Sequence, residues 1–230
     1  MKISELFYSR QGEGKLTGTP SLFVRVSGCN LRCWFCDTPY ASWNPEGINY
    51  SIDEILSQLE KLAPDCRHAV LTGGEPMIFP QLVELTEKLK ARDFHITIET
   101  AGTKLLSVQC DLMSISPKLS NSAPNVKEHP RWHQLHQQRR LPISTLKNLI
   151  SKYNYQLKFV LETPEELIEI ETLLTQLGKV PANKVWLMPE GTEQNFLSEK
   201  EAWLIPLCQK KGFQFCPRKQ IEWYGNKRGT

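Results

Sequence analysis

Apolar, β-branched segments alternate with amphipathic segments along this chain, and this alternation restricts the possible folds more than any other feature. Such alternation is typical of strand–helix units around a parallel sheet. A chain of 230 residues can bury one sizeable core and lies in the size range of single-domain α/β barrels. We therefore expect one domain over residues 1–230, an incomplete α/β barrel of about six parallel strands. Strands are predicted at residues 22–26, 68–72, 94–99, 112–116, 156–161, 185–188 and 213–215.

Three segments begin with Ser or Thr three residues before Glu, which is the pattern of a helix capping box. The pattern predicts helices starting at Ser51, at Thr163 and at Ser198, the last of these ending near Gln209. Gly178 is the predicted stop of the second helix.

Residues 119–142, here called the excursion, interrupt the alternation because they are rich in Asn, Pro, His, Gln and Arg. A long segment of this composition indicates an excursion or lid. His129, His133 and His136 have helical spacing, so they form either a metal site or, as the composition favours, a solvated basic face.

Cys29, Cys33 and Cys36 form the pattern CxxxCxxC. Three thiolates at this spacing reach one small volume only if the backbone loops around a centre, such as a soft metal or an iron–sulfur cluster. In a 4Fe-4S cluster, three ligands leave one iron open, and an open site indicates reaction chemistry. A structural zinc site would need a fourth ligand, which no second CxxC or HxxxH close downstream supplies. Disulfides are disfavoured, since 7 cysteines is an odd number and no signal peptide opens the chain.

The other cysteines, Cys66, Cys110, Cys208 and Cys216, stand singly beside apolar residues and are expected to be buried thiols. The net charge of +3 is too small to indicate nucleic-acid binding by itself. No apolar run approaches the roughly 18 residues of a membrane span. Reduced thiols without an export signal predict a cytoplasmic protein.

Polar motifs follow three predicted strands at the edge where α/β sheets bind ligands. The run Thr-Gly-Gly-Glu-Pro at 72–76 has paired glycines that let the backbone approach a ligand closely. Glu99 puts a carboxylate at the same edge, although a solvated strand-end glutamate would look the same. The run Ser-Pro-Lys at 116–118 contains a lysine whose charge suits a carboxylate. An ordinary surface lysine is the alternative interpretation.

The cysteine run resembles the signature of the radical S-adenosylmethionine superfamily, and 72–76 resembles its segment that holds the amino group of the cofactor's methionine. Nearly the whole chain is similar to one family in it, the 7-carboxy-7-deazaguanine synthases. The discriminating run is Gln-Gly-Glu-Gly at 11–14, since the other two motifs belong to the whole superfamily. Further similar segments are 7–10, 23–29, 36–38, 116–118, 157–160, 187–192 and 224–230.

The resemblance implies a radical S-adenosylmethionine core, a 4Fe-4S cluster, S-adenosyl-L-methionine and Mg²⁺. In the implied reaction, a 5′-deoxyadenosyl radical takes a hydrogen from C6 of 6-carboxy-5,6,7,8-tetrahydropterin. The ring contracts, ammonia leaves and 7-carboxy-7-deazaguanine forms, on the way to queuosine or another 7-deazapurine. The resemblance also implies a homodimer and a reducing partner such as flavodoxin or ferredoxin, with no membrane and no direct nucleic-acid contact.

The resemblance assigns binding roles to single residues and no catalytic residue beyond the cluster and cofactor. The metal ligands would be Cys29, Cys33 and Cys36 for the cluster and Thr38 for Mg²⁺. S-adenosylmethionine would contact Phe35, Cys36, Asp37, Gly74, Glu75, Ser116, Pro117 and Lys118. The pterin would contact Arg10, Gln11, Gly12, Glu13, Arg25 and Thr72.

Several of these roles agree with the chemistry of the side chains. Arg25 lies between Val24 and Val26 and so faces the other side of its strand, where a guanidinium fork suits the substrate's carboxylate. Gln11 and Glu13 offer donors and acceptors for the edge of an aminopyrimidinone ring. A hydroxyl such as that of Thr38 suits Mg²⁺, although a helix-capping threonine is the structural alternative.

Two other functions remain open from the sequence. An activase that installs a glycyl radical on a protein partner would share the cysteine and glycine motifs. A non-catalytic iron–sulfur or zinc module could instead bind RNA through the arginine-rich residues 131–140.

Overall fold

The computed structural model describes residues 1–230, and its strands form one nine-stranded sheet in the order β3-β1-β2-β4-β5-β6-β7-β8-β9. β1 is antiparallel to both of its neighbours, and all neighbouring pairs from β2 to β9 are parallel. The strands are β1 (Lys2–Arg10), β2 (Pro20–Val26), β3 (Ile48–Asn49), β4 (His68–Gly73), β5 (His95–Thr100), β6 (Leu112–Ile115), β7 (Tyr155–Leu161), β8 (Val185–Pro189) and β9 (Gln214–Phe215).

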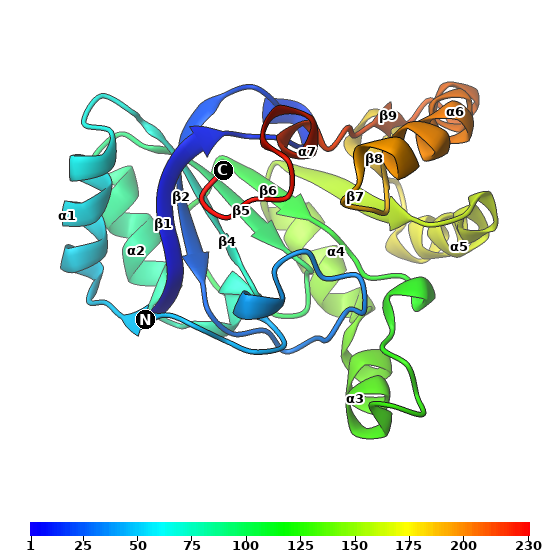
Figure 1. The fold of residues 1–230 in the computed structure, drawn as a ribbon, viewed down its shortest axis with the longest axis horizontal. Coiled ribbons are helices and arrows are strands. Elements are labelled where there is room, and N and C mark those ends of the chain that lie inside the picture. Colours follow the sequence, from blue (N-terminus) through cyan, green and yellow to red (C-terminus); the bar gives the residue numbers. More distant parts are fainter.

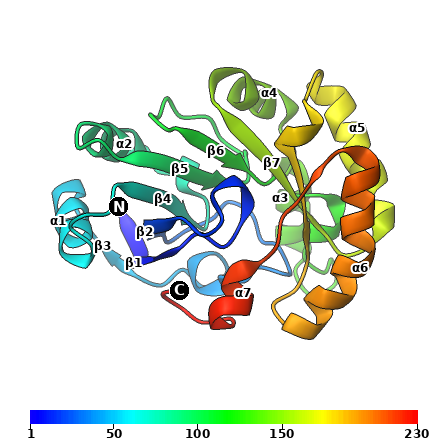
Figure 2. The same cartoon turned by 90° about the horizontal axis from the view of Figure 1, so that it is seen from above.

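Helices cover one side of this curved sheet (Figure 1). Figure 2 shows α1, α2, α4, α5 and α6 around its outer side, whereas α7 and the C-terminus lie on the inner side. The helices are α1 (Ile52–Leu62), α2 (Leu82–Lys90), α3 (Pro130–Arg139), α4 (Ile143–Lys152), α5 (Leu167–Leu177), α6 (Gln194–Lys211) and α7 (Lys219–Tyr224).

All seven predicted strands are present, and each end lies within two residues of the prediction. They form seven parallel strands rather than about six, and the two edge strands, β3 and β9, do not pair with each other, so the barrel is open. The middle of β4 is buried on both faces, since Ala69, Val70 and Leu71 are all buried, and this explains the continuous apolar run in the strand. The core is one cluster of 33 buried residues.

β1 was not among the predicted strands. It pairs with β2 in a register that sets Leu6 opposite Val24, with an irregularity between Ile3 and Glu5. Of its nine residues only Ile3 and Phe7 are buried. A strand that buries so little has no strong apolar alternation, which is why the sequence pattern does not reveal it.

The capping box at the start of α1 is confirmed. Ser51 Oγ accepts the Glu54 amide at 3.2 Å, and Glu54 Oε2 accepts the Ser51 amide at 2.7 Å. The box at Thr163 is also present, but it opens a short 3₁₀ turn (Pro164–Glu166) ahead of α5. α5 ends as predicted at Gly178, whose φ of +98° favours glycine.

The predicted start of the helix at Ser198 is wrong. α6 begins four residues earlier, at Gln194, and Ser198 Oγ donates to the Gln194 carbonyl at 3.0 Å from inside the helix. A further helix, α7, follows α6.

The excursion contains a 3₁₀ turn (Ser120–Ser122) and α3, which stands at the lower edge of the molecule in Figure 1. The prediction of a solvated histidine face is wrong for His136, which is completely buried. His129 packs against Trp43 with ring centres 4.7 Å apart, and His133 Nδ1 lies 2.8 Å from the Pro124 carbonyl. α3 therefore packs part of its histidine face inward.

None of the helices combines the length and apolar character needed to cross a membrane.

Replacing Ser51 with alanine tests the contribution of the capping box. Ser51→Ala leaves the first-turn amides without their side-chain acceptor, so we expect the free energy of unfolding to fall by about 1 kcal/mol. Urea unfolding of both proteins measures this difference. Ser57→Ala, at an exposed position of the same helix, is the matched control and is expected to change stability by less than about 0.5 kcal/mol. Equal losses in the two variants would contradict the capping role.

Candidate active site

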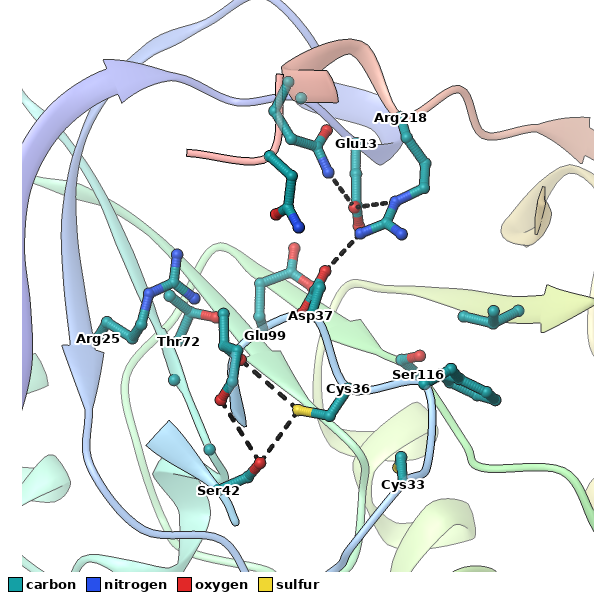
Figure 3. A pocket seen from close by; sticks show the side chains of 18 of the residues that line it. Glu13, Arg25, Cys33, Cys36, Asp37, Ser42, Thr72, Glu99, Ser116 and Arg218 are labelled. Carbon is teal, nitrogen blue, oxygen red and sulfur yellow. Dashed lines mark hydrogen bonds and ion pairs between the residues drawn. The ribbon is translucent and has the colours of Figure 1, made fainter. Parts of the chain in front are cut away.

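The carboxyl ends of the parallel strands surround a pocket of about 540 Å³. β4, β5 and β7 contribute Thr72, Glu99 and Lys158 to its wall, and Ser116 follows the end of β6. Figure 3 shows side chains from these elements around one cavity. The loops after β1 and β2 and the C-terminal segment (residues 218–230) complete the wall.

All predicted site residues line this pocket except Glu75 and Pro117. Those that line it are Arg10, Gln11, Gly12, Glu13, Arg25, Cys29, Cys33, Phe35, Cys36, Asp37, Thr38, Thr72, Gly74, Ser116 and Lys118.

The cysteine loop (residues 28–42) follows β2 and returns to its own start. The Gly28 amide donates to the Ala41 carbonyl at 2.8 Å, which joins the two ends of the loop. Trp43 Nε1 donates to the Cys33 carbonyl at 2.9 Å, and Ser42 Oγ lies 3.1 Å from Cys36 Sγ (Figure 3). The loop thus brings the three cysteines to one pocket.

The three half-buried thiols form a donor set that suits an iron–sulfur cluster. Burial raises the pKa of Cys29 and of Cys33 to about 12, so both thiols stay neutral unless a cation such as iron lies beside them. No three His, Cys, Asp or Glu side chains converge closely enough to hold a single metal ion. The thiolates of a four-iron cluster bind different irons and therefore need not converge on one atom.

Two glycines after β4 let the cysteine loop lie directly on the sheet edge. The Gly74 amide donates to the Val26 carbonyl at 3.2 Å, and the Glu75 amide donates to the Gly28 carbonyl at 2.9 Å. A Cβ at position 74 would lie 2.1 Å from the Gly28 oxygen, and Gly73 has a φ of +137°. The paired glycines therefore serve contact between two backbone segments, in addition to any approach to a ligand.

Glu75 is completely buried behind the pocket wall. Its Oε1 accepts from Thr100 Oγ1 at 2.6 Å and from the Met77 amide at 3.0 Å, and its Oε2 accepts from the Ala101 amide at 2.8 Å. Burial raises the pKa of this carboxyl group. The side chain thus joins the ends of β4 and β5 and does not face the cavity.

A set of ion pairs around two buried cations, Lys158 and Arg218, crosses the pocket, and Figure 3 shows the pairs that Arg218 makes. Lys158 Nζ lies 3.0 Å from Glu13 Oε2 and 2.8 Å from Glu99 Oε2. Arg218 Nε lies 3.5 Å from Glu13 Oε1, and the Arg218 guanidinium also pairs with Asp37. Because buried charges need compensating partners, these pairs tie the loop after β1, the sheet, the cysteine loop and the C-terminal segment together.

Burial alone would raise the pKa of Glu13, but the charges of Lys158 and Arg218 outweigh it and lower the pKa to about 2. The carboxylates of Glu99 and Glu13 raise the pKa of Lys158, although burial opposes them. Both groups are therefore charged at neutral pH.

No sequence motif assigned a binding or catalytic role to Lys158 or Arg218. Lys158 could have been found, because a lysine inside a strand with a buried apolar pattern is almost always paired. Arg218 carried no such signal. Only the tertiary fold brings it to Asp37, which lies 181 residues earlier.

The C-terminal segment packs against the Gln-Gly-Glu-Gly loop. The Lys219 amide donates to the Gly12 carbonyl at 3.0 Å, and Gln220 Nε2 donates to Glu13 Oε1 at 2.6 Å. A Cβ at position 12 would lie 2.7 Å from the backbone nitrogen of Gln220 as well as 2.0 Å from its Oε1, so this approach requires glycine. The two segments together form one side of the pocket.

Arg25 already has a partner in the protein. Its Nε lies 2.6 Å from Glu5 Oε2, which also accepts a hydrogen bond from the Tyr40 hydroxyl at 2.9 Å. This ion pair uses only Nε, so the two terminal nitrogens of the guanidinium are available to an anion in the pocket.

Thr38 precedes the 3₁₀ turn Pro39–Ala41, but its side chain makes no capping hydrogen bond. The capping alternative for this residue is therefore wrong. Its Oγ1 lies 3.8 Å from Cys36 Sγ, and Thr38 lines the cavity.

Comparison with known proteins agrees with this geometry. A family profile described as "Radical SAM superfamily" matches residues 23–118. A 7-carboxy-7-deazaguanine synthase of Rhodopirellula baltica is 51% identical over 99% of this chain and 88% of its own length. A protein of the same name from Halobacterium salinarum is 41% identical over 96% of this chain and 89% of its own length.

Among solved structures, the crystal structure of QueE from Escherichia coli has a similar fold, with a TM-score of 0.73. It is 22% identical in sequence, and the match covers 95% of this chain and 93% of that one.

The profile match, the three-cysteine loop and the open parallel sheet together define a member of the radical S-adenosylmethionine superfamily. The similarity over nearly the full length of the chain identifies one family within this superfamily. The chain belongs to the 7-carboxy-7-deazaguanine synthase family.

The Glu13 ion pairs predict a specific loss of stability in acid. Glu13 has a lower pKa in the folded chain, about 2, than its ordinary 4.5, so its stabilisation is complete above pH 4.5 and is lost as the pH falls toward 2. Between pH 5 and 3 the metal-free protein should lose about 2 kcal/mol of unfolding free energy through this group. Glu13→Gln should lack this loss in urea unfolding at both pH values.

Glu199→Gln, which removes an exposed carboxylate that makes no ion pair, is the control. It should show the same pH dependence as the unsubstituted protein. If Glu13→Gln also kept the full pH dependence, the charged state assigned to Glu13 would be wrong.

Proposed function

We propose that this protein is a radical S-adenosylmethionine enzyme that converts 6-carboxy-5,6,7,8-tetrahydropterin to 7-carboxy-7-deazaguanine, with loss of ammonia. The product would enter the biosynthesis of queuosine or another 7-deazapurine. The similarity to named synthases over 99% and 96% of the chain carries this proposal. It favours the synthase over a glycyl-radical activase and over a non-catalytic RNA-binding module.

Cys29, Cys33 and Cys36 would hold the 4Fe-4S cluster, with one iron left open for S-adenosylmethionine. When bound, these cofactors supply the electron and the radical that removes a hydrogen from the pterin, so the protein's own residues position and shield the reactants.

Lys118 is the residue best suited to the carboxylate of the cofactor. Its Nζ is fixed by a 2.7 Å hydrogen bond to Ser116 Oγ, and both residues line the pocket. Phe35, Asp37 and Gly74 line it beside the cysteines and complete the proposed cofactor site. Glu75 and Pro117 would act indirectly, by holding the strand ends in place.

The proposed pterin site lies between the loop after β1 and the sheet. Gln11 Nε2 donates to Ser21 Oγ at 2.9 Å, which leaves its amide oxygen for a donor on the ring. The charged Glu13 offers an acceptor, and the terminal nitrogens of Arg25 suit the pterin carboxylate. Arg10, Gly12 and Thr72 complete the proposed contacts.

We further propose that Thr38 binds Mg²⁺ through its hydroxyl, since this ion takes few protein ligands and keeps several waters. A homodimer and a reducing partner such as flavodoxin or ferredoxin are proposed from the family resemblance. The single buried cluster of 33 residues supports the proposal of one domain over residues 1–230.

An anaerobic assay of the reconstituted protein with the pterin, S-adenosylmethionine, Mg²⁺ and a reductant tests the proposed function. Formation of 7-carboxy-7-deazaguanine is expected. A protein with a full cluster that cleaves S-adenosylmethionine but leaves the pterin unchanged would refute the substrate assignment.

Replacing Cys33 with alanine should remove the cluster, because two thiolates cannot hold four irons. Iron and acid-labile sulfide, the visible absorbance of the cluster and product formation should all be lost. Cys66→Ala, at a half-buried cysteine outside the pocket, is the matched control and should keep all three. Retention of iron by Cys33→Ala together with its loss from Cys66→Ala would show that the ligands are assigned wrongly.

Thr38→Ala should leave the fold, the cluster and the slow cleavage of S-adenosylmethionine without substrate unchanged. Because the hydroxyl is the proposed protein ligand of Mg²⁺, only the stimulation of pterin turnover by Mg²⁺ should fall. A Mg²⁺ titration of turnover, with thermal melts alongside, measures this. Thr38→Ser, which keeps the hydroxyl, should respond almost as the unsubstituted protein does. A normal Mg²⁺ response from Thr38→Ala would exclude the metal role.

A further inference from the structure

The excursion holds the cysteine loop from outside, at positions on either side of Cys33. The Arg32 amide donates to His136 Nδ1 at 3.2 Å, and the Trp34 amide donates to the Ser122 carbonyl at 3.2 Å. His136 lies on α3 and Ser122 on the 3₁₀ turn of the excursion. Both amides next to Cys33 are therefore bound by the same segment.

Side-chain contacts strengthen this attachment. The Arg32 guanidinium stacks on Trp132 of α3 at 3.9 Å, and its Nη1 donates to the Cys29 carbonyl at 2.7 Å. Trp34 Nε1 donates to the Asn121 carbonyl at 2.7 Å. These contacts connect the excursion to the residues on both sides of Cys33.

The hydrogen bonds around His136 determine which of its ring nitrogens carries a proton. Ser122 Oγ donates its proton to the Leu119 carbonyl at 2.5 Å, so at the 2.9 Å contact with His136 it must accept from Nε2–H. Nδ1 is then the acceptor that the Arg32 amide requires. A neutral ring with its proton on Nε2 satisfies both contacts.

Burial agrees with this neutral form. The side chain of His136 is completely buried and has no carboxylate partner. Burial, aided by the charges of Arg140, Lys118 and His133, lowers its pKa to about 4. A histidine in this state is a fixed acceptor for one backbone amide.

We propose that His136 is a positioning residue for the cluster: through its bond to the Arg32 amide it fixes the turn from which Cys33 reaches the iron. This inference rests on the proposed function only in that it requires the cluster itself. Partners outside the ligand set orient the ligands and control how firmly a metal site is held, and hydrogen bonds near the sulfurs help to set its reduction potential. The excursion therefore supports the cysteine loop from outside, and none of residues 119–142 lines the pocket.

Two substitutions at position 136 separate the hydrogen bond from simple packing. His136→Asn keeps an acceptor close to the position of Nδ1, whereas His136→Leu fills a similar volume without one. His133→Leu is the matched control, because the His133 ring bonds to Pro124 within the excursion and does not touch the cysteine loop.

The readouts are iron and sulfide content after anaerobic reconstitution, the rate of cluster loss to an iron chelator, and the reduction potential from a titration followed by electron paramagnetic resonance. His136→Leu should lose its cluster about tenfold faster than the unsubstituted protein, with a shifted potential. His136→Asn should stay within about threefold of the unsubstituted rate. His133→Leu should match the unsubstituted protein in both rate and potential.

Thermal melts of the metal-free proteins show whether each variant folds. If His136→Leu does not fold, Trp132→Leu, which removes the stacking on Arg32, replaces it and should also speed the loss of the cluster. A folded His136→Leu, or Trp132→Leu in its place, that keeps the cluster and potential of the unsubstituted protein would overturn the inference and leave the proposed function intact. An unsubstituted protein that binds no cluster would overturn both.

Discussion

The contact between the backbones at Gly28 and Gly74 is the constraint on which the site depends. Parallel pairing of β2 with β4 puts their carboxyl ends side by side, and the missing side chain at position 74 lets the cysteine loop lie against the turn after β4. Glu75 then fixes that turn to β5 from the buried side. The cysteines, the proposed cofactor contacts and the proposed pterin contacts share one pocket because these backbone segments touch.

Ion pairs join the segments that surround the open side of this pocket. Glu13, Lys158 and Glu99 alternate in sign across the pocket, and Arg218 joins the same set to Asp37 beside Cys36. Removing one carboxylate partner from such a network leaves the buried charge of Lys158 or Arg218 uncompensated, which costs more than an exposed pair contributes. The network therefore favours one arrangement of segments that lie far apart in the chain.

The strands, the first helix and the cysteine loop could be predicted because local patterns determine them: apolar runs, a capping box and the spacing of three ligands. β1 could not, since it buries only Ile3 and Phe7. The burial of His136, the partner of Arg218 and the ion pair of Arg25 with Glu5 depend on which distant segments meet, and no local pattern contains that information. Glu75 has the predicted place along the chain, but three hydrogen bonds turn its side chain away from the cavity.

The edges of the sheet have a consequence for association. Both end in strands of two residues, β3 at one edge and β9 at the other. Long exposed edges present rows of unpaired amides and carbonyls that recruit further strands and promote aggregation, whereas short edges do not. At the first edge, however, β3 covers only Lys2 and Ile3 of β1, so residues 5–10 of β1 pair with β2 alone and present a longer edge to which a further strand could add.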